Sequence, residues 1–415
     1  MRFIIEKGPP LRGEAKVAPA KNAALPILAA ALLTKEELFV EDLPGISDIA
    51  AMLEILGLFG VRLGREGRAA CLCAENPRQP KERAYAPVRQ MRASILVLGP
   101  LLARLGEAFL PLPGGCAIGS RPVDLHVKGL EALGADIEYE EGGLRCRAAG
   151  LRGATVYLDS PSVGATENIL MAATLARGST LIQNAAREPE IVDLARVLSA
   201  MGARISGAGT SFIAVEGVES LHGARVTPMP DRIEAGTLLL CAAATRGEIL
   251  LRGAAPEHLF ALNAKLLECG CELRISGDQI YVRGGPRRGV DVQTQVYPGF
   301  PTDLQAPMMA LLCRAKGSSI LVESIFENRF MHAAELRRMG AQITVRDRIA
   351  VVRGVKKLYG TELLCTDLRA GAALVLAALD AEGQSRIGGV EHIDRGYENL
   401  EQKLGALGAR IRREE

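Results

Sequence analysis

The chain has 415 residues, of which 48% are hydrophobic and 24% charged, and its formal net charge is only +2. This balance is that of an ordinary globular protein of two or three domains, and it excludes a disordered chain or one built to bind an acidic polymer. Aromatic residues make up 4% and tryptophan is absent, so stacking platforms for single-stranded nucleic acid are not expected either.

Membrane attachment has no support in the sequence. The longest apolar run covers the eleven residues Ala23–Leu33 and contains Pro26, whereas a membrane-spanning helix needs about 20 apolar residues. The opening stretch MRFIIEKGPP lacks the long apolar segment of a signal peptide. The sequence therefore predicts a soluble, cytoplasmic protein whose partners include neither a membrane nor a nucleic acid.

The nine cysteines indicate packing rather than metal or redox chemistry. They lie at positions 71, 73, 116, 146, 241, 269, 271, 313 and 365 and form no Cys-x-x-Cys pair. The two Cys-x-Cys pairs fall in segments that resemble strands, where alternation sends both side chains to one face. We therefore expect small core residues, without a disulfide framework.

Six copies of one pattern run along the chain at nearly equal intervals. In order they read LGLFGVRL, LEALGADI, LSAMGARI, LLECGCEL, LRRMGAQI and LGALGARI. Their last glycines are Gly60, Gly134, Gly202, Gly270, Gly340 and Gly408, separated by 74, 68, 68, 70 and 68 residues. This periodicity indicates six structural units of about 70 residues each.

Within each unit an apolar segment precedes the repeated pattern. The six segments are NAALPILAAALL, RASILVLGPLLARL, ATENILMAATLA, EAGTLLLCAAAT, DLQAPMMALLCRA and RAGAALVLAALDA. Small and apolar residues occur on all sides of them, which predicts buried helices. A short strand such as SSILVES follows in most units, then a more amphipathic helix ending at the repeat glycine, as suits a helix C-cap, and then an alternating strand such as AQITVRD.

These elements predict an α/β fold. A solenoid of stacked repeats is the alternative, but solenoid units are usually about 20–50 residues long, shorter than these. We expect two closed globular domains of three units each, with the apolar helices packed inside. The middle of the six units falls near TPMPDRIEAG, whose two prolines suit a crossover between the domains.

The first polar candidates lie in APAKNAALP, where Lys21 and Asn22 immediately precede an apolar helix. Asn22 suits the N-cap position of that helix. A helix N-terminus with an adjacent lysine also suits an anion. The residues alone leave both interpretations open, helix capping alone or anion binding.

The stretch GGCAIGSRPVDLH surrounds Cys116 with glycines, which favour a mobile loop. Arg121 follows five residues later and would favour the thiolate form of Cys116. A reactive thiol and a loop cysteine without a role both fit these residues. His126, at the end of the stretch, is expected to be a hydrogen-bonded structural histidine.

Asp303 in YPGFPTDLQAP stands where a proline-rich turn meets a helix. It can be a capping or first-turn acid, or a general base presented from the start of the helix.

Four arginines near unit ends form the last set of candidates. They are Arg92, Arg329, Arg369 and Arg395. Each alone fits an ordinary surface arginine, but together they would suit one anionic ligand, because a guanidinium group grips carboxylate or phosphate with two hydrogen bonds. The sequence has no P-loop and no G-x-G-x-x-G motif, so ATP or dinucleotide binding has no support.

Nine segments together resemble one family. They are AKNAALPIL, MRASILVLGPL, GGCAIGSRPVDLH, PSVGATEN, NAAREPEIVDLA, FPTDLQAP, FENRFMH, TDLRAG and HIDRGYENLE. In order and over essentially the whole chain, they resemble the UDP-N-acetylglucosamine 1-carboxyvinyltransferases, the enolpyruvyl transferases that open bacterial peptidoglycan synthesis. The resemblance implies a two-domain inside-out α/β barrel with three similar units in each domain.

The resemblance also implies a domain division. Residues 20–227 would form the domain with the mobile Cys116 loop. Residues 1–19 plus 228–415 would form the second domain, with Asp303, Arg369 and Arg395. The active site would lie in the cleft between the two domains.

The implied reaction transfers the enolpyruvyl group of phosphoenolpyruvate to the 3′-hydroxyl of UDP-N-acetylglucosamine and releases phosphate. It passes through a tetrahedral intermediate and needs no cofactor and no metal. By resemblance, Cys116 is the general acid toward the enol carbon, can hold phosphoenolpyruvate covalently and is the target of fosfomycin. Asp303 takes the hydroxyl proton, and Lys21, Arg121 and Arg395 bind the phosphate and carboxylate of phosphoenolpyruvate.

Further contacts to the two small-molecule substrates are implied in the same way. Arg92 resembles a sugar-nucleotide contact, and Asn22 and Ile325 resemble sugar-side contacts. Arg329 and Arg369 resemble a cationic surround. The uridine-binding run and the diphosphate contacts are implied to be Arg121, Pro122, Val123, Asp124 and Leu125, and Ser162, Val163 and Gly164, respectively. The family suggests a monomer.

Three alternatives remain open at this point. A 3-phosphoshikimate enolpyruvyl transferase would share the fold and the phosphoenolpyruvate chemistry, although Cys116 and the RPVDL run argue against it. A non-catalytic UDP-sugar-binding paralogue is the second alternative, although the intact set Lys21, Cys116, Asp303 and Arg395 argues against it. A thiol redox protein would rest on Cys116 alone.

Overall fold

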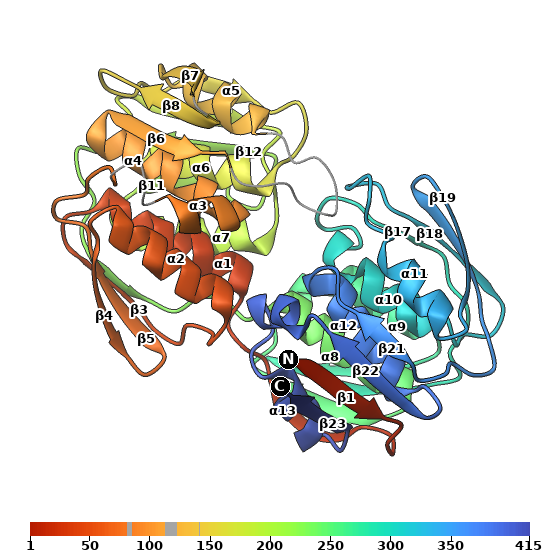
Figure 1. Cartoon of the computed structure of the whole chain (residues 1–415). Coiled ribbons are helices and arrows are strands. Elements are labelled where there is room, and N and C mark those ends of the chain that lie inside the picture. Colours follow the sequence, from red (N-terminus) through yellow and green to blue (C-terminus); the bar gives the residue numbers. More distant parts are fainter. Residues whose placement is uncertain (81–84, 113–122, 141) are drawn as a thin grey trace. The chain divides into compact units, whose positions relative to one another are not determined.

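The computed structural model describes residues 1–80, 85–112, 123–140 and 142–415 of the chain (Figure 1). These residues form two compact units. Unit 1 contains Met1–Ala18 and Pro230–Glu415, and unit 2 contains the described residues between Pro19 and Met229. No helix in the described part of the chain is long and apolar enough to cross a membrane.

Unit 2 contains three sheets. In spatial order their strands are β13 (Ala224–Val226), β3 (Glu37–Val40), β5 (Ala69–Cys73) and β4 (Arg62–Glu66) in the first, β6 (Glu107–Pro111), β8 (Gly143–Arg147) and β7 (Asp136–Glu140) in the second, and β11 (Arg204–Ser206), β12 (Phe212–Glu216), β10 (Ser179–Gln183) and β9 (Thr155–Tyr157) in the third.

Unit 1 contains three more sheets. In spatial order their strands are β15 (Glu272–Ser276), β16 (Gln279–Arg283), β14 (Glu248–Arg252) and β2 (Arg12–Lys16) in the first, β17 (Val292–Gln293), β18 (Ser318–Val322), β20 (Ile349–Arg353) and β19 (Gln342–Arg346) in the second, and β21 (Glu362–Leu364), β22 (Gln384–Gly388), β1 (Arg2–Glu6) and β23 (Arg410–Glu414) in the third.

The four-stranded sheets share one topology. A central strand pairs in parallel with the strand on one side. On its other side it pairs antiparallel with a third strand, which in turn pairs antiparallel with the fourth. In the sheet of β18, for example, Leu321 pairs in parallel with Val292 of β17, and Ser318 pairs antiparallel with Arg353 of β20. In three sheets the parallel strands follow one another in the chain and are joined by a buried helix, as β17 and β18 are by α10. The start of that helix then lies at the carboxyl end of the first strand.

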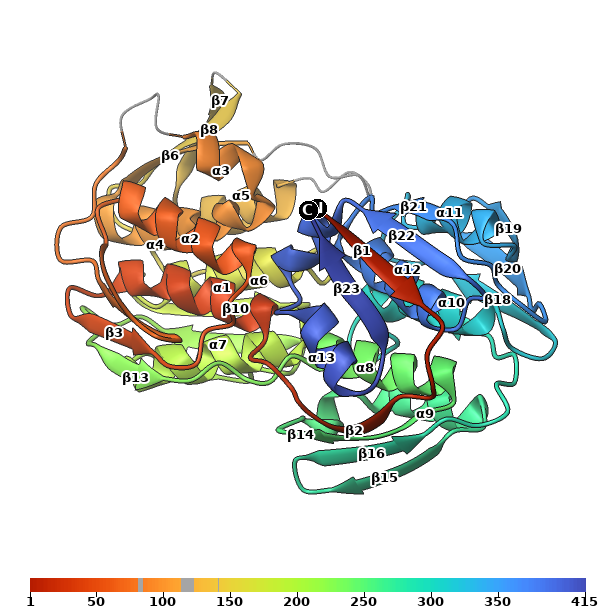
Figure 2. The same ribbon diagram turned by 60° about the horizontal axis from the view of Figure 1, so that its bottom comes forward.

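The chain ends are built into the repeat of unit 1 (Figure 2). Strand β1 lies between β22 and β23, where Arg2 pairs with Gly388 on one side and Glu414 on the other. Strand β2 pairs in parallel with β14, although β2 precedes unit 2 in the chain. The amino-terminal segment therefore completes two of the three sheets of unit 1.

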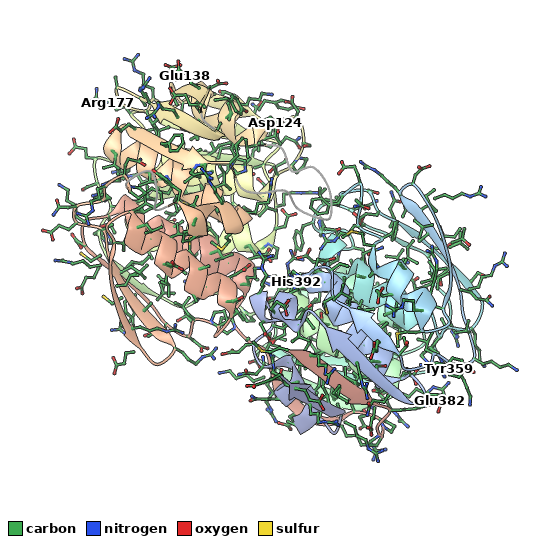
Figure 3. The ribbon with its side chains drawn as sticks, in the orientation of Figure 1. Asp124, Glu138, Arg177, Tyr359, Glu382 and His392 are labelled. Atoms are coloured by element: carbon green, nitrogen blue, oxygen red, sulfur yellow. The ribbon has the colours of Figure 1, made fainter. Side chains whose placement is uncertain are left out.

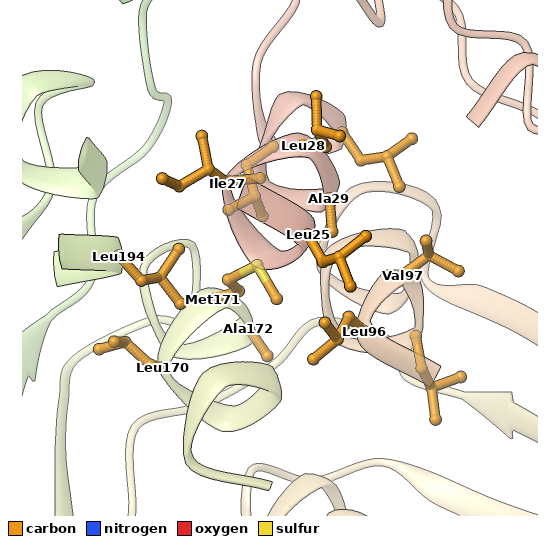
Figure 4. Close-up of a cluster of buried hydrophobic side chains, with 14 of the residues drawn as sticks. Leu25, Ile27, Leu28, Ala29, Leu96, Val97, Leu170, Met171, Ala172 and Leu194 are labelled. Carbon is orange, nitrogen blue, oxygen red and sulfur yellow. The ribbon is translucent and has the colours of Figure 1, made fainter. Parts of the chain in front are cut away.

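The predicted apolar helices are confirmed as buried. They are α1 (Lys21–Ala30), α4 (Leu98–Leu105), α6 (Val163–Ala173), α8 (Arg232–Thr245), α10 (Gln305–Leu312) and α12 (Leu368–Leu379). Every residue of α8 except Thr245 is buried, and each buried leucine contributes about 1.5–3 kcal/mol. Figure 4 shows this packing in unit 2, where Leu25 of α1 and Met171 of α6 lie close to Leu96.

The repeat glycines end the second helix of each unit, also as predicted. These helices are α2 (Ser47–Leu58), α5 (Asp124–Ala132), α7 (Pro189–Ala200), α9 (Phe260–Glu268), α11 (His332–Arg338) and α13 (Leu400–Ala406). All six glycines have positive φ, from 86° at Gly60 to 100° at Gly202. In each unit the amide that follows the glycine bonds back to the helix, as Ala409 does to Leu404 O at 3.0 Å, which is the Schellman pattern.

The remaining elements are short. They are α3 (Ala86–Gln90) and the 3₁₀ turns η1 (Ala31–Leu33), η3 (Arg92–Val97), η4 (Pro256–His258), η5 (Thr302–Leu304) and η6 (Val390–Arg395).

Three repeats close into each unit, so the predicted two-domain α/β fold is confirmed and the solenoid is excluded. Within each unit the apolar helices form the interior and the sheets lie around them (Figure 1). None of the six sheets, as far as the described residues go, closes on itself into a barrel.

The cysteine prediction needs one correction. The eight described cysteines are free thiols, and seven of them are buried, while Cys71 is half-buried. Cys71 and Cys73 lie on β5 as expected. Cys269, however, is the C-cap of α9, and Cys271 precedes β15, so strand alternation does not place this pair. The turn at Gly270 buries both thiols instead.

Candidate active site

The starts of the buried helices carry about half of the predicted site residues. In unit 1, α8, α10 and α12 contact one another. Asp231 caps α8 by accepting hydrogen bonds from Ile233 N (2.8 Å) and Glu234 N (2.9 Å). Asp367 caps α12 in the same way through Arg369 N and Ala370 N, at 2.9 and 3.0 Å. The first turns of these helices therefore hold polar side chains fixed next to apolar packing.

Asp303 lies in η5, which leads into α10, and it joins two arginines that are distant in sequence. Arg329 Nη2 donates to its Oδ1 at 2.6 Å, and Arg369 Nη2 donates to its Oδ2 at 2.8 Å. The arginine side chains are only 5% and 6% exposed, whereas that of Asp303 is 24% exposed. The carboxylate thus pairs with two buried arginines and remains partly accessible to solvent.

The electrostatics of this cluster favour its charged form. Burial alone would raise the pKa of Asp303, but the guanidinium groups of Arg369 and Arg329 outweigh it and hold this pKa well below its usual value. Burial lowers the pKa of Arg369, but Asp303 more than compensates and the net shift is upward. Asp303 is therefore an ionised acceptor in the absence of substrate.

Aromatic side chains support both arginines. The guanidinium carbon of Arg369 lies 5.4 Å from the ring centre of Tyr397, and that of Arg329 lies 5.1 Å from the ring centre of Phe326. Tyr397 is fully buried and its hydroxyl lies 2.9 Å from Thr237 Oγ1. Arg395 is half-buried at the end of η6, two residues before Tyr397.

In unit 2, Lys21 begins α1 and forms an ion pair with Asp48 at 2.5 Å. The side chains are 13% and 8% exposed, so this lysine is fixed at the helix start rather than free in solvent. The prediction that Asn22 is the N-cap is wrong. Ala20 occupies that position with extended backbone angles and no side-chain cap, and half-buried Asn22 lies in the first turn.

Two of the predicted nucleotide contacts of unit 2, Gly164 and Arg92, lie near His126, which lies in α5. A Cβ atom on Gly164 would be 3.4 Å from His126 Nε2, so the start of α6 touches this ring. Burial and the nearby Arg92 lower the pKa of His126 to about 4. The ring is therefore neutral at neutral pH, with the start of α6 against it and Arg92 near enough to affect its charge.

Asn168 fixes the tautomer of His126. Its amide oxygen accepts from Gly99 N at 2.6 Å and its amide nitrogen donates to Ile95 O at 2.7 Å, which sets the orientation of the amide. The same nitrogen lies 3.0 Å from His126 Nδ1, which must then accept. The ring proton is thus on Nε2, on the side of Gly164. His126 is hydrogen-bonded, as the sequence predicted.

The other predicted contacts of unit 2 have the following places. Ser162 caps α6, with its Oγ accepting from Ala165 N at 3.4 Å, and Val163 starts that helix. Val123 is buried at the N-cap of α5, Asp124 is exposed in the first turn, as Figure 3 shows, and Leu125 is half-buried. The predicted residues Cys116, Arg121 and Pro122 lie outside the described residues.

Two structural residues of the Asp303 cluster escaped the sequence analysis. Thr302 Oγ1 accepts from Arg329 Nη1 at 3.0 Å, and Glu323, fully buried behind it, accepts from Thr302 at 2.9 Å. The only signal in the sequence is a glutamate directly after the strand SSILV, where a charged residue is not expected to be buried. Ile325 follows, half-buried.

The described residues bring the predicted site together in two groups, one in each unit. Asp303, Arg329 and Arg369 are in direct contact in unit 1, and Arg92 and Gly164 both lie near His126 in unit 2. No group of three or more His, Cys, Asp or Glu side chains in the described part of the chain is placed to hold a metal ion. These side chains can bind anions and move protons.

Comparisons with known proteins identify the family of the chain. The profile of a family described as EPSP synthase (3-phosphoshikimate 1-carboxyvinyltransferase) matches residues 5–404. A UDP-N-acetylglucosamine 1-carboxyvinyltransferase of Caldanaerobacter subterraneus is 50% identical over 413 residues, 99% of either chain. One of Carboxydothermus hydrogenoformans is 53% identical over 416 residues, again 99% of either chain.

Among solved structures, the enolpyruvyl transferase NikO from Streptomyces tendae has the same fold. The TM-score is 0.90 at 26% sequence identity, and the match covers 99% of this chain and 98% of that one. The chain therefore belongs to the enolpyruvyl transferase family, in which its full-length relatives are named UDP-N-acetylglucosamine 1-carboxyvinyltransferases.

Proposed function

We propose that this protein transfers the enolpyruvyl group of phosphoenolpyruvate to the 3′-hydroxyl of UDP-N-acetylglucosamine and releases phosphate, as a transferase of peptidoglycan synthesis. The observation that carries this is the Asp303 carboxylate, held by Arg329 and Arg369 at the start of a buried helix. Such a group can receive a hydroxyl proton beside a cationic site for an anionic substrate. The names of the full-length relatives support this choice of acceptor.

The reaction balances with this chain's own residues. The sugar oxygen bonds to C2 of phosphoenolpyruvate while its proton goes to Asp303, and Cys116 supplies a proton to C3, which becomes a methyl group. Phosphate then leaves C2 of the tetrahedral intermediate and takes the proton held by Asp303, while the Cys116 thiolate takes a proton back from C3, which restores the double bond. We assign the phosphate and carboxylate of phosphoenolpyruvate to Lys21, Arg121 and Arg395.

The two arginines on Asp303 explain how its basicity can depend on substrate. As long as both donate to it, Asp303 is a weak base. An anion that attracts Arg369 would weaken one of these ion pairs and raise the pKa of the carboxyl group. The base would then gain strength when phosphoenolpyruvate is present.

The nucleotide belongs, in this proposal, to the group of unit 2. The first-turn amides of α6, its cap Ser162 and the nearby Arg92 supply donors and positive charge for a diphosphate. We assign the uridine to residues 121–125, of which Asp124 is exposed, and the sugar to Asn22 and Ile325.

Phosphate release with two alternative acceptors tests this function. With phosphoenolpyruvate, turnover is expected with UDP-N-acetylglucosamine and not with 3-phosphoshikimate. Asp303→Asn should lower kcat by about 10²–10⁴-fold, as expected for loss of a general base. Binding of UDP-N-acetylglucosamine without turnover would instead identify a sugar-nucleotide sensor.

Fosfomycin labelling tests the role of Cys116. One fosfomycin mass should appear on the peptide that contains Cys116, and Cys116→Ser should abolish both labelling and turnover while UDP-N-acetylglucosamine still binds. Five of the other thiols provide the control, because burial keeps them protonated and unreactive. Burial raises the pKa to about 12 for Cys146, Cys241, Cys269, Cys313 and Cys365.

We further propose that the protein acts as a cytoplasmic monomer. Both substrates are small molecules, and the residues assigned to them all come from one chain. Sedimentation at increasing concentration should give the mass of a single 44.2 kDa chain with and without substrates.

A further inference from the structure

Glu323 is a fully buried acid directly after β18, and it is surrounded by hydrogen-bond donors. Its Oε1 accepts from Thr294 Oγ1 and from Ile325 N, both at 2.9 Å, and from Phe326 N at 3.2 Å. Its Oε2 accepts from Thr302 Oγ1 at 2.9 Å. Since a buried acid is costly unless its oxygens are hydrogen-bonded, this full set of donors explains why the side chain is tolerated.

The pairing of two strands creates this position. β17 and β18 are parallel, with Gln293 opposite Val322, so the next residues, Thr294 and Glu323, lie together at the carboxyl ends of the strands. The helix that joins these strands starts at the same edge, which brings Thr302 against Glu323. The acid therefore holds three segments of one repeat.

The hydroxyl group of Thr302 has only one possible orientation. Arg329 Nη1 lies 3.0 Å from Thr302 Oγ1, and a guanidinium group can only donate, so the hydroxyl oxygen accepts there. The single hydroxyl proton then goes to Glu323. Because the guanidinium group is planar, fixing Nη1 also directs Nη2, which donates to Asp303 at 2.6 Å.

We propose that Glu323 is a positioning residue for the reaction: through Thr302 and Arg329 it fixes the carboxylate of Asp303. Through the amide of Ile325 it also holds the backbone of the segment assigned to the sugar. This inference rests on the proposed function, which makes Asp303 the base. A base must point at the hydroxyl group it deprotonates, and a misplacement of about 1 Å can cost about 10²-fold in rate.

Two substitutions of Thr302 separate positioning from simple packing. Thr302→Val keeps the shape and loses the hydroxyl group, whereas Thr302→Ser keeps the hydroxyl group. We expect Thr302→Val to lower kcat by about 10–10²-fold with nearly unchanged KM for both substrates. Thr302→Ser should remain close to wild type. Glu323→Gln should resemble Thr302→Val, but it alters a buried acid, so the Thr302 pair keeps the test decisive if that variant does not fold.

The pH profile gives a readout that a packing role would not move. In Thr302→Val, Arg329 is no longer aligned on Asp303, so the carboxylate is less stabilised and the acid limb of the kcat profile should shift to higher pH. In Thr302→Ser it should stay in place. Equal kcat losses in both variants, or an unshifted acid limb in Thr302→Val, would overturn the proposal.

A measurement without substrate separates this inference from the proposed function. Stability from the Asp303 ion pairs is lost as pH falls from the unfolded to the folded pKa of Asp303. In urea unfolding, Thr302→Val, but not Thr302→Ser, should therefore lose less stability in acid than wild type, and its loss should end at a higher pH. If wild type releases no phosphate with UDP-N-acetylglucosamine, the proposed function is wrong, but the unfolding curves still test whether Thr302 positions Arg329 on Asp303. If wild type turns over and all three proteins share one acid-unfolding curve, this positioning role is wrong and the proposed function stands.

Discussion

Arg369 donates a hydrogen bond to Asp303 across 66 positions of sequence, with 2.8 Å between Nη2 and Oδ2. The two residues stand at the starts of η5–α10 and of α12, the apolar helices of consecutive repeats. These helices pack side by side, so equivalent positions of neighbouring repeats meet. The site in unit 1 is thus a consequence of repeating one motif whose helix starts face the same way.

Replacing Asp303 should destabilise the fold and not only stop turnover. In Asp303→Asn, two arginines that are 5% and 6% exposed lose their counter-charge, and breaking a buried pair costs about 3 kcal/mol or more. Urea unfolding at pH 7 should show this loss. The pKa of Asp303 is depressed in the fold, so its stabilisation is complete above about pH 4 and is lost as pH falls toward the folded pKa. The difference between wild type and variant should shrink only below about pH 4.

Asp394→Asn is the matched control for this prediction. Asp394 also pairs with an arginine, at 2.7 Å from Arg413 Nη2, but these side chains are 31% and 27% exposed. Its loss should cost about 1 kcal/mol or less. Equal losses in the two variants would contradict a special role for burial at Asp303.

Two glycines of one helix allow the repeat signature itself to be tested. Gly408 follows α13 with φ +98°, while Gly405 lies inside α13, and a Cβ atom on either would meet nothing within 4 Å. Both positions therefore have room for a Cβ atom, and they differ only in their backbone φ angle. Gly408→Ala should destabilise by about 1–2 kcal/mol, because L-residues avoid this region. Gly405→Ala should stabilise by about 0.5–1 kcal/mol. Thermal unfolding measures both effects. If the Tm of the two variants moved in the same direction relative to wild type, the C-cap role of Gly408 would be contradicted.

The sequence predicted features that depend on local backbone and on period. The repeat glycines mark helix ends because only glycine tolerates their φ angles, and the apolar segments become the interior because they have no polar face. Polar residues at the start of such a helix, as at Lys21 and Asp303, stand out in sequence for the same reason. All of these signals lie within about 20 residues of each other.

Features that depend on strand pairing were not predictable in this way. Glu323 and Thr294 meet only because β17 pairs with β18, and β1 closes the last repeat although it lies at the other end of the chain. The misplaced cap at Asn22 has a local cause. An asparagine at the N-cap and one in the first turn give nearly the same sequence pattern, and a cap is worth only about 1 kcal/mol.

Two buried histidines should make the protein less stable in weak acid. Burial lowers the pKa of both His126 and His332 to about 4, whereas an unfolded histidine titrates near 6.5. Between these values the unfolded state binds more protons, so stability is lost as pH falls from about 6.5 to about 4. Each histidine should contribute about 3 kcal/mol to this loss.

Single and double variants measure these contributions. His126→Gln and His332→Gln should each reduce the slope of unfolding free energy against pH between about 6.5 and 4.5, and the double variant should reduce it further. Urea unfolding at several pH values gives the slopes. A slope that stays unchanged in His126→Gln would mean that this ring is charged in the fold, against the tautomer that Asn168 imposes.

Glu167 should have the opposite pH dependence. It lies in α6, is 4% exposed, and its Oε1 has no hydrogen-bond partner among the described residues. Burial raises its pKa well above the ordinary value, and the nearby Glu190 and Glu188 add to this. Between about pH 4.5 and the pKa of Glu167 in the fold, the folded state holds one proton more than the unfolded state, so stability is lost as pH rises.

Glu167→Gln should therefore have the same free energy of unfolding as wild type near pH 4.5. At higher pH the variant should become the more stable protein, by up to about 1.4 kcal/mol per pH unit. Urea unfolding from pH 4.5 to 8 checks this, with Glu54→Gln on the exposed side of α2 as the control that should stay within about 0.5 kcal/mol of wild type throughout. A constant difference between Glu167→Gln and wild type over this pH range would show that Glu167 is already ionised in the fold.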